Sequence, residues 1–167
     1  TLFHEIIRII KYKKPKAILL ENVNHLLKHD NGQTFSIIKN TIENLNYSFF
    51  YKIIRASDFN LPQHRARLFM VGLRDSSKFI FPESKKLLKK MSDIFGGQCN
   101  KEIGYTLRVG GRGSGINDRR NWDTYLVDNQ IVKLKSKHAK KMQGFPKNFK
   151  FTVTETQAMK QLGNSVA

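Results

Sequence analysis

The sequence predicts an α/β fold in which part of an open sheet is followed by a smaller, loop-rich region. Helix and strand patterns alternate through residues 1–74 in the order helix, strand, helix, strand, strand, which is typical of an open α/β sheet. Residues 96–132 are instead glycine-rich and irregular, and a helical pattern returns at about Ser136. This change of character after Pro82 predicts a second, smaller structural region.

Two helices are predicted in the first region, from apolar residues that recur at helical spacing. Residues 1–11 carry leucine, phenylalanine and isoleucine on one face, and Pro15 ends that segment. Residues 33–45 repeat phenylalanine, isoleucine and leucine with the same period. Each helix therefore has an apolar face that can pack on a sheet.

Three strands are predicted between and after these helices. Residues 16–23 (KAILLENV) form a short apolar run that ends in Glu-Asn, the pattern of a buried parallel strand. Residues 47–56 are aromatic and β-branched, as strands commonly are. Residues 67–74 (RLFMVGLR) are apolar and complete this part of the sheet.

The second region is predicted to begin with an amphipathic helix over residues 84–95, which carries a lysine face. Short strands are expected near 104–109 and 124–133, and helical segments follow them. The final residues, QLGNSVA, place Asn164 or Ser165 where the N-cap of a further helix is expected. Together with a first residue that is not Met, this indicates a piece of a longer protein.

The composition points to a polyanionic partner. The chain has 167 residues, with 30 Lys+Arg against 13 Asp+Glu and a net charge of +17. No apolar run approaches the ~18 residues of a membrane-spanning helix, so we expect no membrane partner. The single cysteine, Cys99, excludes an internal disulfide and fits a reducing cytoplasm. No Cys/His cluster has the spacing of zinc ligands, so no metal site is expected.

Glu21 is a candidate functional carboxylate because of its place in the predicted sheet. In open α/β sheets, residues that contact ligands collect at the carboxyl ends of strands. Glu21 and Asn22 lie at such an end. The alternative, a carboxylate that caps the segment after the strand, stays open at this point.

Arg65 and Arg67 stand at the entrance of the last predicted strand. Because strand side chains alternate between faces, both arginines are expected to share one face with Phe69 and Val71. Two like charges on a half-buried strand are costly unless an anionic or polar group meets them. Solvated edge charges are the alternative, but the apolar continuation of the strand argues against it.

Residues 110–118 (GGRGSGIND) are glycine-rich but match no phosphate-binding loop. No Gly-Lys-Ser/Thr follows them, and the dinucleotide pattern G-x-G-x-x-G is absent. A flexible loop that carries arginines and a tryptophan suits nucleic acid better. These side chains are Arg108, Arg112, Arg119, Arg120 and Trp122. A plain glycine-rich surface loop remains the alternative.

Five short motifs follow one another in an order that resembles a known family. They are ENV (21–23), QHRAR (63–67), TL (106–107), MQGFP (142–146) and QLGNSV (161–166). In this order, they resemble the C-terminal part of bacterial DNA cytosine-5 methyltransferases. The resemblance covers essentially the whole chain.

The resemblance implies a fold and a reaction. The fold is the second half of a Rossmann-like methyltransferase sheet plus a small, loop-rich target recognition domain. The implied domains are the C-terminal part of the catalytic domain (1–82), the target recognition domain (83–135) and a segment that returns to pack on the catalytic domain (136–167). Such enzymes flip a cytosine out of duplex DNA, add a cysteine thiolate to C6, and transfer a methyl group from S-adenosyl-L-methionine to C5.

The resemblance also implies roles for individual residues. Glu21 contacts N3 of the flipped base, Arg67 binds the base from the other side, and Arg65 holds neighbouring catalytic groups or backbone. Asn164, Ser165 and Val166 match the motif that packs beside the cofactor. The resemblance also implies DNA contacts by Gln63, Thr106, Leu107, Arg108, Arg112, Asn117, Arg119 and Arg120. Gln63 is in addition expected to support Arg65.

Two motifs of the family do not occur in these 167 residues: the glycine-rich cofactor loop and the Pro-Cys pair that carries the nucleophile. Cys99 lies in the wrong place to replace that cysteine. We therefore expect no activity from the chain alone, and an N-terminal methyltransferase half as a partner besides double-stranded DNA. Two alternatives stay open: a DNA-binding module without catalysis, and an RNA-binding protein favoured by charge only. A restriction–modification role follows from the resemblance.

Overall fold

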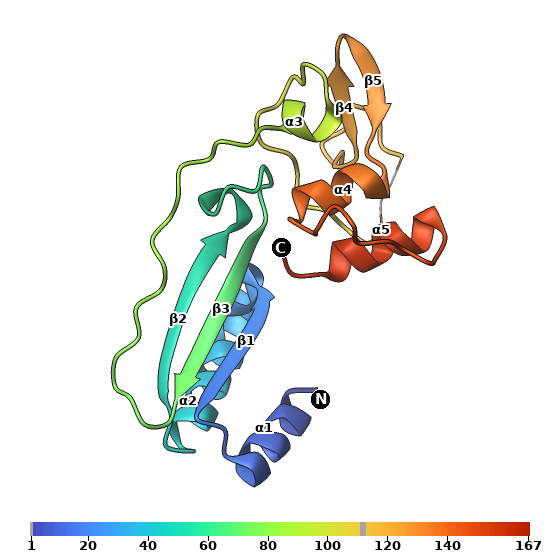
Figure 1. Cartoon of the computed structure of the whole chain (residues 1–167). Coiled ribbons are helices and arrows are strands. Elements are labelled where there is room, and N and C mark those ends of the chain that lie inside the picture. The colour runs from blue at the N-terminus through green and yellow to red at the C-terminus, as the bar shows by residue number, and fades with distance from the viewer. Residues whose placement is uncertain (1, 111–112) are drawn as a thin grey trace. The chain divides into compact units, whose positions relative to one another are not determined.

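The computed structural model describes residues 2–110 and 113–167 (Figure 1). Contacts between Cα atoms divide the chain into two compact units. The first unit comprises Thr1–Ile54 and Ala66–Glu83, and the second comprises Arg55–Arg65 and Ser84–Ala167. In the part of the chain that is described, no helix is long and apolar enough to cross a membrane.

The first unit contains the α/β sheet. Its elements are α1 (Leu2–Lys13), β1 (Ala17–Val23), a 3-10 segment (Asn24–Gly32), α2 (Gln33–Glu43), β2 (Ser48–Arg55) and β3 (Ala66–Leu73). Both predicted helices and all the predicted strands of this region are thereby confirmed, with small differences in their bounds.

The sheet has the strand order β1-β3-β2, and β1 runs antiparallel to β3. The prediction of a buried parallel strand for residues 16–23 is therefore wrong. Among the described residues, β1 has a neighbour on one edge only, and apolar helix faces pack on one face of the sheet. Ile18 consequently lies in the core, whereas 69% of the Leu19 surface is exposed on the opposite face.

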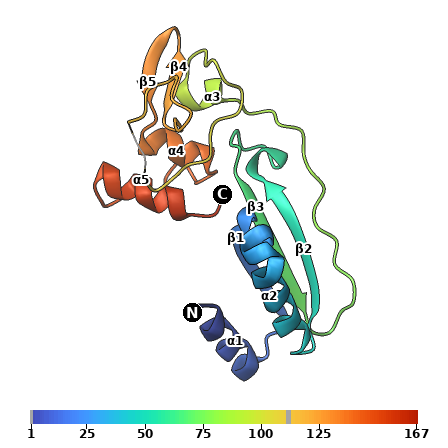
Figure 2. The same cartoon turned by 180° about the vertical axis from the view of Figure 1, so that it is seen from behind.

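The core of the first unit lies between the sheet and its helices. Figure 2 shows α2 in front of the sheet, and Figure 1 shows it behind, from the other side. Ile7 and Ile10 of α1 and Ile42 of α2 are buried in one cluster with Ile18 and Met70 of the strands. Burial of this apolar surface holds β1 and β3 in a fixed register.

The second unit combines short helices with a β-hairpin. Its elements are a 3-10 turn (Ala56–Asp58), α3 (Met91–Phe95), β4 (Thr124–Val127), β5 (Gln130–Lys133), α4 (Ser136–Met142) and α5 (Glu155–Asn164). The antiparallel β4–β5 pair confirms the strand prediction near 124–133. Buried side chains from α3, the hairpin, α4, α5 and the loop before the hairpin form one core, among them Met91, Leu107, Trp122, Met142 and Leu162.

The predicted helix over residues 84–95 is wrong over its first half, since α3 covers only Met91–Phe95. The backbone donors of the preceding residues are used elsewhere. The Lys85 amide donates to the carbonyl oxygen of Asp58, and the Leu88 and Lys89 amides donate to the side-chain oxygen of Asn60 at 2.8 and 2.9 Å. These long-range bonds replace the i→i−4 bonds that a helix needs.

One further expectation for this region is corrected. Residues 104–109 form no strand; Gly104 makes an isolated bridge with Gln63 instead. Asn164 is the last residue of α5 and Ser165 is its C-cap, with an extended backbone; the further helix expected after them stays a prediction. The helix begins at a capping box in which Thr154 and Gln157 satisfy each other's backbone N–H groups.

Candidate functional site

Glu21 and Arg67 meet on one face of the sheet in the first unit. The antiparallel register pairs Glu21 with Phe69 and Val23 with Arg67, which makes Glu21 and Arg67 diagonal neighbours on that face. Arg67 Nε lies 3.0 Å from Glu21 Oε1, and the two side chains are 15% and 27% exposed. The structure therefore brings together two residues that lie 46 positions apart (67 − 21).

The structure excludes one interpretation of Glu21, that of a cap for the following segment, and leaves its functional role a prediction. No side chain caps the segment that follows β1, so the Glu21 carboxylate meets a guanidinium rather than backbone amides. Arg67 Nη1 donates to its neighbour's carbonyl oxygen, that of Ala66, at 2.9 Å. Within the described residues, its Nη2 group has no partner and can donate to a bound molecule. A carboxyl group and an oriented guanidinium together suit a ligand that has both nitrogen and carbonyl oxygen.

Arg65 has a different place from the one predicted. Strand β3 begins at Ala66, and Arg65 belongs to the second unit. The prediction that Arg65 and Arg67 share one face of a strand is therefore wrong. Arg65 is 3% exposed. Its guanidinium donates to the carbonyl oxygens of Leu107 at 3.2 Å, Gly163 at 3.0 Å and Ser165 at 2.5 Å. It thus holds backbone, which is one of the two roles expected for it.

Gln63 and Gln143 extend this buried polar network. Gln63 is fully buried; its amide oxygen accepts from Leu107 N at 3.3 Å and its amide nitrogen donates to Met142 O at 3.5 Å. Gln143, which the sequence did not single out, donates to Leu162 O at 2.8 Å. The network joins the segments of four of the motifs. Although Gln63 was expected to contact DNA, its amide is used inside the protein.

The Thr106-Leu107 pair also faces inward. The Thr106 hydroxyl donates to the carbonyl oxygen of His64, and Leu107 is 2% exposed in the core of the second unit. The backbone of Arg108 packs closely against Gly163. A Cβ at position 163 would lie 2.8 Å from that backbone, so glycine permits the contact. The side chain of Leu107 is therefore not available to DNA, whereas Thr106 is partly exposed and its role in DNA contact stays a prediction.

The arginine-rich loop is exposed, as a nucleic-acid contact requires. Arg108, Asn117, Arg119 and Arg120 have exposed side chains, and Arg112 lies outside the described residues. Trp122 does not belong to this surface: it is 1% exposed and its indole nitrogen donates to Gly110 O. The tryptophan that was expected to belong to a nucleic-acid-binding loop is thus part of the core.

Arg120 is held by a carboxylate within the loop. Its Nε and Nη2 donate to the two oxygens of Asp118 at 3.1 and 2.8 Å. The hydrogen bonds from Arg120 lower the pKa of Asp118 to about 2, so this pair is charged at neutral pH. Arg119 has no such partner in the described part of the chain, which leaves it the more available cation.

The residues matched to the cofactor motif lie at the end of α5. Asn164 and Val166 are exposed, and Val166 keeps 49% of its surface accessible. Ser165 is turned inward, since its hydroxyl donates to Leu162 O at 2.9 Å and its carbonyl oxygen accepts from Arg65. Asn164 and Val166 are therefore free to pack against a ligand, whereas Ser165 fixes the backbone.

Solved methyltransferases share this fold. A methyltransferase of Entamoeba histolytica, EhMeth, superposes with a TM-score of 0.70 at 19% identity, over 98% of this chain and 64% of its own. A putative DNA modification methyltransferase from an E. coli prophage gives 0.69 at 17%, over 99% and 69%. The predicted fold class, the second half of a Rossmann-like methyltransferase sheet plus a small loop-rich region, is confirmed.

Sequence comparisons identify the family. The model of the C-5 cytosine-specific DNA methylase family matches residues 1–110 and 97–167. The Type II methyltransferases M.SsoII of Shigella sonnei and M.NgoBI of Neisseria gonorrhoeae are 38% and 32% identical over all of this chain, which spans 54% and 62% of their length. The chain therefore belongs to the C-5 cytosine-specific DNA methylase family and corresponds to the C-terminal part of its longer members.

Proposed function

We propose that this chain is the C-terminal part of a DNA (cytosine-5-)-methyltransferase that acts on a flipped cytosine within a specific DNA sequence, in a restriction–modification system. The observation that carries the proposal is the pairing of Glu21 with Arg67 at 3.0 Å on neighbouring strands. Because the chain belongs to this family, we expect the flipped base to bind beside these two side chains. S-adenosyl-L-methionine supplies the methyl group when bound.

The chemistry assigns different tasks to the two side chains. When protonated, the Glu21 carboxyl donates a hydrogen bond to N3 of cytosine and so favours addition of a thiolate at C6. The Arg67 guanidinium orients that carboxyl group and offers its remaining N–H groups to the carbonyl oxygen of the base. Arg65 acts through the backbone that it holds, and is a positioning residue. Asn164 and Val166 are assigned to pack beside the cofactor.

Specificity is assigned to the second unit. The proposed target recognition domain is 83–135, between the catalytic part (1–82) and the return segment (136–167). Support comes from the exposed cations of the loop, since arginine is the side chain that most often reads guanine. Arg108 and Arg119 are proposed as base or phosphate contacts. Arg120 becomes available only when it leaves Asp118.

These 167 residues contain no Pro-Cys pair, because the single cysteine follows Gln98. We infer that the chain alone transfers no methyl group and that an N-terminal methyltransferase half supplies the nucleophile. A DNA-binding subunit without catalysis is the second candidate, favoured by the same observation and by the net charge of +17.

Methyl transfer from tritiated S-adenosyl-L-methionine to duplex DNA tests the proposal. The chain is assayed alone, mixed with the N-terminal part of the Shigella sonnei relative that it does not match, and fused to that part as a hybrid enzyme. We expect label in cytosine only when both parts are present. Label from the chain alone contradicts the inferred dependence on a second part. A folded hybrid that binds DNA but never methylates favours the binding subunit.

A further inference from the structure

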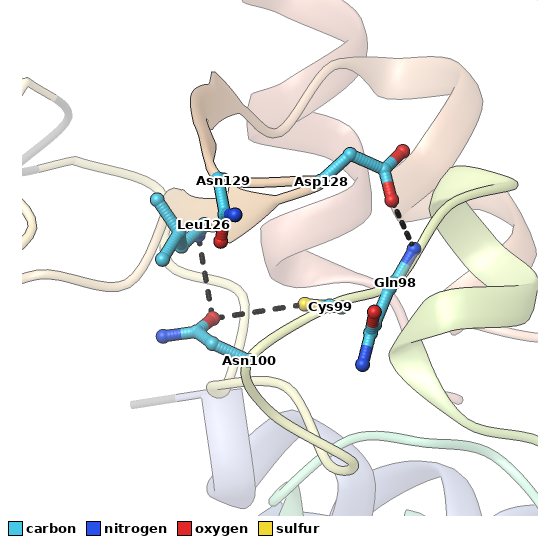
Figure 3. Close-up of a pocket in the computed structure, with 6 residues that line it drawn as sticks. All are labelled: Gln98, Cys99, Asn100, Leu126, Asp128 and Asn129. Carbon is cyan, nitrogen blue, oxygen red and sulfur yellow. Dashed lines mark hydrogen bonds between the residues drawn. The ribbon is translucent and has the colours of Figure 1, made fainter.

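A hollow of about 190 Å³ lies in the second unit, where the segment after α3 meets the β4–β5 hairpin (Figure 3). One water molecule occupies about 30 Å³ in the liquid, so the hollow can receive a larger group. Its lining consists of Gln98, Cys99, Asn100, Leu126, Asp128 and Asn129. Among these lining residues there is no lysine or arginine, although the chain has 30 of them. The hollow is therefore lined by amides and a carboxylate on an otherwise basic protein.

Backbone hydrogen bonds hold the walls of the hollow in place. Asn100 N donates to Leu126 O at 3.0 Å, and Asp128 N donates to Gln98 O at 2.9 Å. The backbone N–H of Gln98 donates in return to Asp128 Oδ1 at 2.8 Å, as Figure 3 shows. A Cβ on Gly97 would lie 2.2 Å from Asp128 Oδ2, so glycine is needed for this close approach. The walls are thus fixed without using the side-chain amides of Gln98 and Asn129.

Those two amides are available to a ligand. Within the described part of the chain, the side chains of Gln98 and Asn129 have no hydrogen-bond partner, and both residues are exposed. Asn129 has φ 62°, in the tight turn of the hairpin, which holds its backbone in the left-handed region that asparagine tolerates. Each amide offers a donor and an acceptor side by side. Asp128 adds an acceptor, since only one of its oxygens is bonded to Gln98 N.

This set of groups matches the edges of particular bases. In the major groove, adenine presents an acceptor and a donor that asparagine or glutamine can bind in pairs, and cytosine presents a donor to a carboxylate. Lysine and arginine, which bind phosphates and guanine, are absent from the lining residues. A phosphate oxygen would meet the carboxylate of Asp128 unfavourably. The hollow therefore suits a base edge better than the DNA backbone.

The geometry points to a second base-reading site, in which Gln98, Asn129 and Asp128 contact adenine or cytosine of the target sequence in the major groove. This inference rests on the proposed function and adds to it. The arginine-rich loop can read guanine or hold phosphates, whereas the hollow reads bases that arginine does not. Together, the two surfaces let one small unit distinguish a mixed sequence.

Selection from a random library tests this site without requiring methyl transfer. The 167-residue chain is mixed with duplexes that carry a randomised segment, and the bound duplexes are sequenced. For Gln98→Ala, and for Asn129→Gly, which keeps the positive φ, we expect the preference at one adenine- or cytosine-containing pair to fall by roughly 5- to 150-fold. Gln130→Ala is the matched control, since it removes an exposed amide from the same hairpin outside the hollow.

The single cysteine gives an independent readout on the unmodified chain. Cys99 lines the hollow, so a duplex seated there must slow its alkylation by N-ethylmaleimide. We expect the selected duplex to protect Cys99 more than an unrelated duplex of equal length at the same fractional saturation. Equal protection by both duplexes contradicts sequence-dependent occupancy of the hollow.

Three other results overturn the inference. In the first, preferences stay the same in both variants. In the second, binding weakens equally for all sequences, which indicates a phosphate contact. In the third, the chain binds duplexes but selects no sequence. None of these bears on methyl transfer by the hybrid enzyme, so the failure of this site and the failure of the proposed function are distinguishable.

Discussion

Replacing Arg65 with alanine should destabilise the second unit more than any exposed arginine substitution. The guanidinium donates three hydrogen bonds to backbone carbonyl oxygens while 3% exposed. Hydrogen bonds from a charged donor contribute about 1.5–3 kcal/mol each, but bonds that share one group are not additive. Removal leaves acceptors without partners in a buried region, so we expect a loss of about 3–5 kcal/mol.

Trp122 makes this loss measurable in the second unit alone. It is the only tryptophan of the chain and is 1% exposed in that unit's core. With a urea dependence of about 1.5 kcal/mol per molar, the midpoint of the Trp122 fluorescence transition should fall by roughly 2–3 M in Arg65→Ala. Arg65→Lys keeps the charge but loses the planar set of donors of the guanidinium. Its urea midpoint should therefore lie between those of Arg65→Ala and the unchanged chain.

Arg120→Ala is the matched control, because 75% of its side chain is exposed and its loss should cost less than about 0.5 kcal/mol. If Arg65→Ala shifts the midpoint no further than Arg120→Ala, the three hydrogen bonds do not stabilise the unit, and the positioning role of Arg65 fails with them.

Three further predictions use the charges of the chain. With a net charge of +17, affinity for duplex DNA should fall roughly 10³-fold between 50 and 200 mM salt; a constant affinity contradicts a phosphate-dominated interface. Asp118→Asn should free Arg120 and make the salt dependence steeper by about one phosphate contact, whereas Asp30→Asn, the same charge change in the first unit, should act less. Burial, and to a smaller extent the neighbouring lysines, lower the pKa of His138 from 6.5 to about 4. The unfolded chain therefore binds a proton at His138 more readily than the folded chain does. As a result, the free energy of unfolding should fall by about 1–2 kcal/mol from pH 7 to pH 5. This loss should disappear in His138→Gln, and urea titrations at the two pH values check it.

Local patterns predicted the first unit well because its elements follow from periodicity. The apolar spacing of 1–11 and 33–45 gave α1 and α2, and the runs near 16–23 and 67–74 gave the strands. Periodicity carries no information on pairing, so the antiparallel register that joins Glu21 to Arg67 could not be predicted. The helix over 84–95 failed for a related reason, since its backbone donors are taken by distant residues.

The candidate site was predicted in its identities more than in its geometry. The family motifs pointed to Glu21, Arg65 and Arg67, but Arg65 and Arg67 belong to different units because β3 begins between them. Gln143 was missed, although a polar residue beside the apolar Met142 is a signal for a buried hydrogen bond. Gln98 and Asn129 lie 31 positions apart (129 − 98), and only the hairpin brings them to one hollow.

The most direct test of the central claim is the methylation rate of the hybrid enzyme with Glu21→Gln. Glutamine keeps the size and hydrogen-bonding capacity of the side chain but loses the ionisable proton. We predict that single-turnover methyl transfer slows by at least roughly 10²-fold, while affinity for the duplex changes less than about three-fold. Glu43→Gln, an exposed carboxylate of α2 that lies 3.8 Å from Lys39, is the control and should leave the rate unchanged. Methyl transfer by Glu21→Gln at the rate of the unaltered hybrid would contradict the account, because Glu21 would then be a structural partner of Arg67 only.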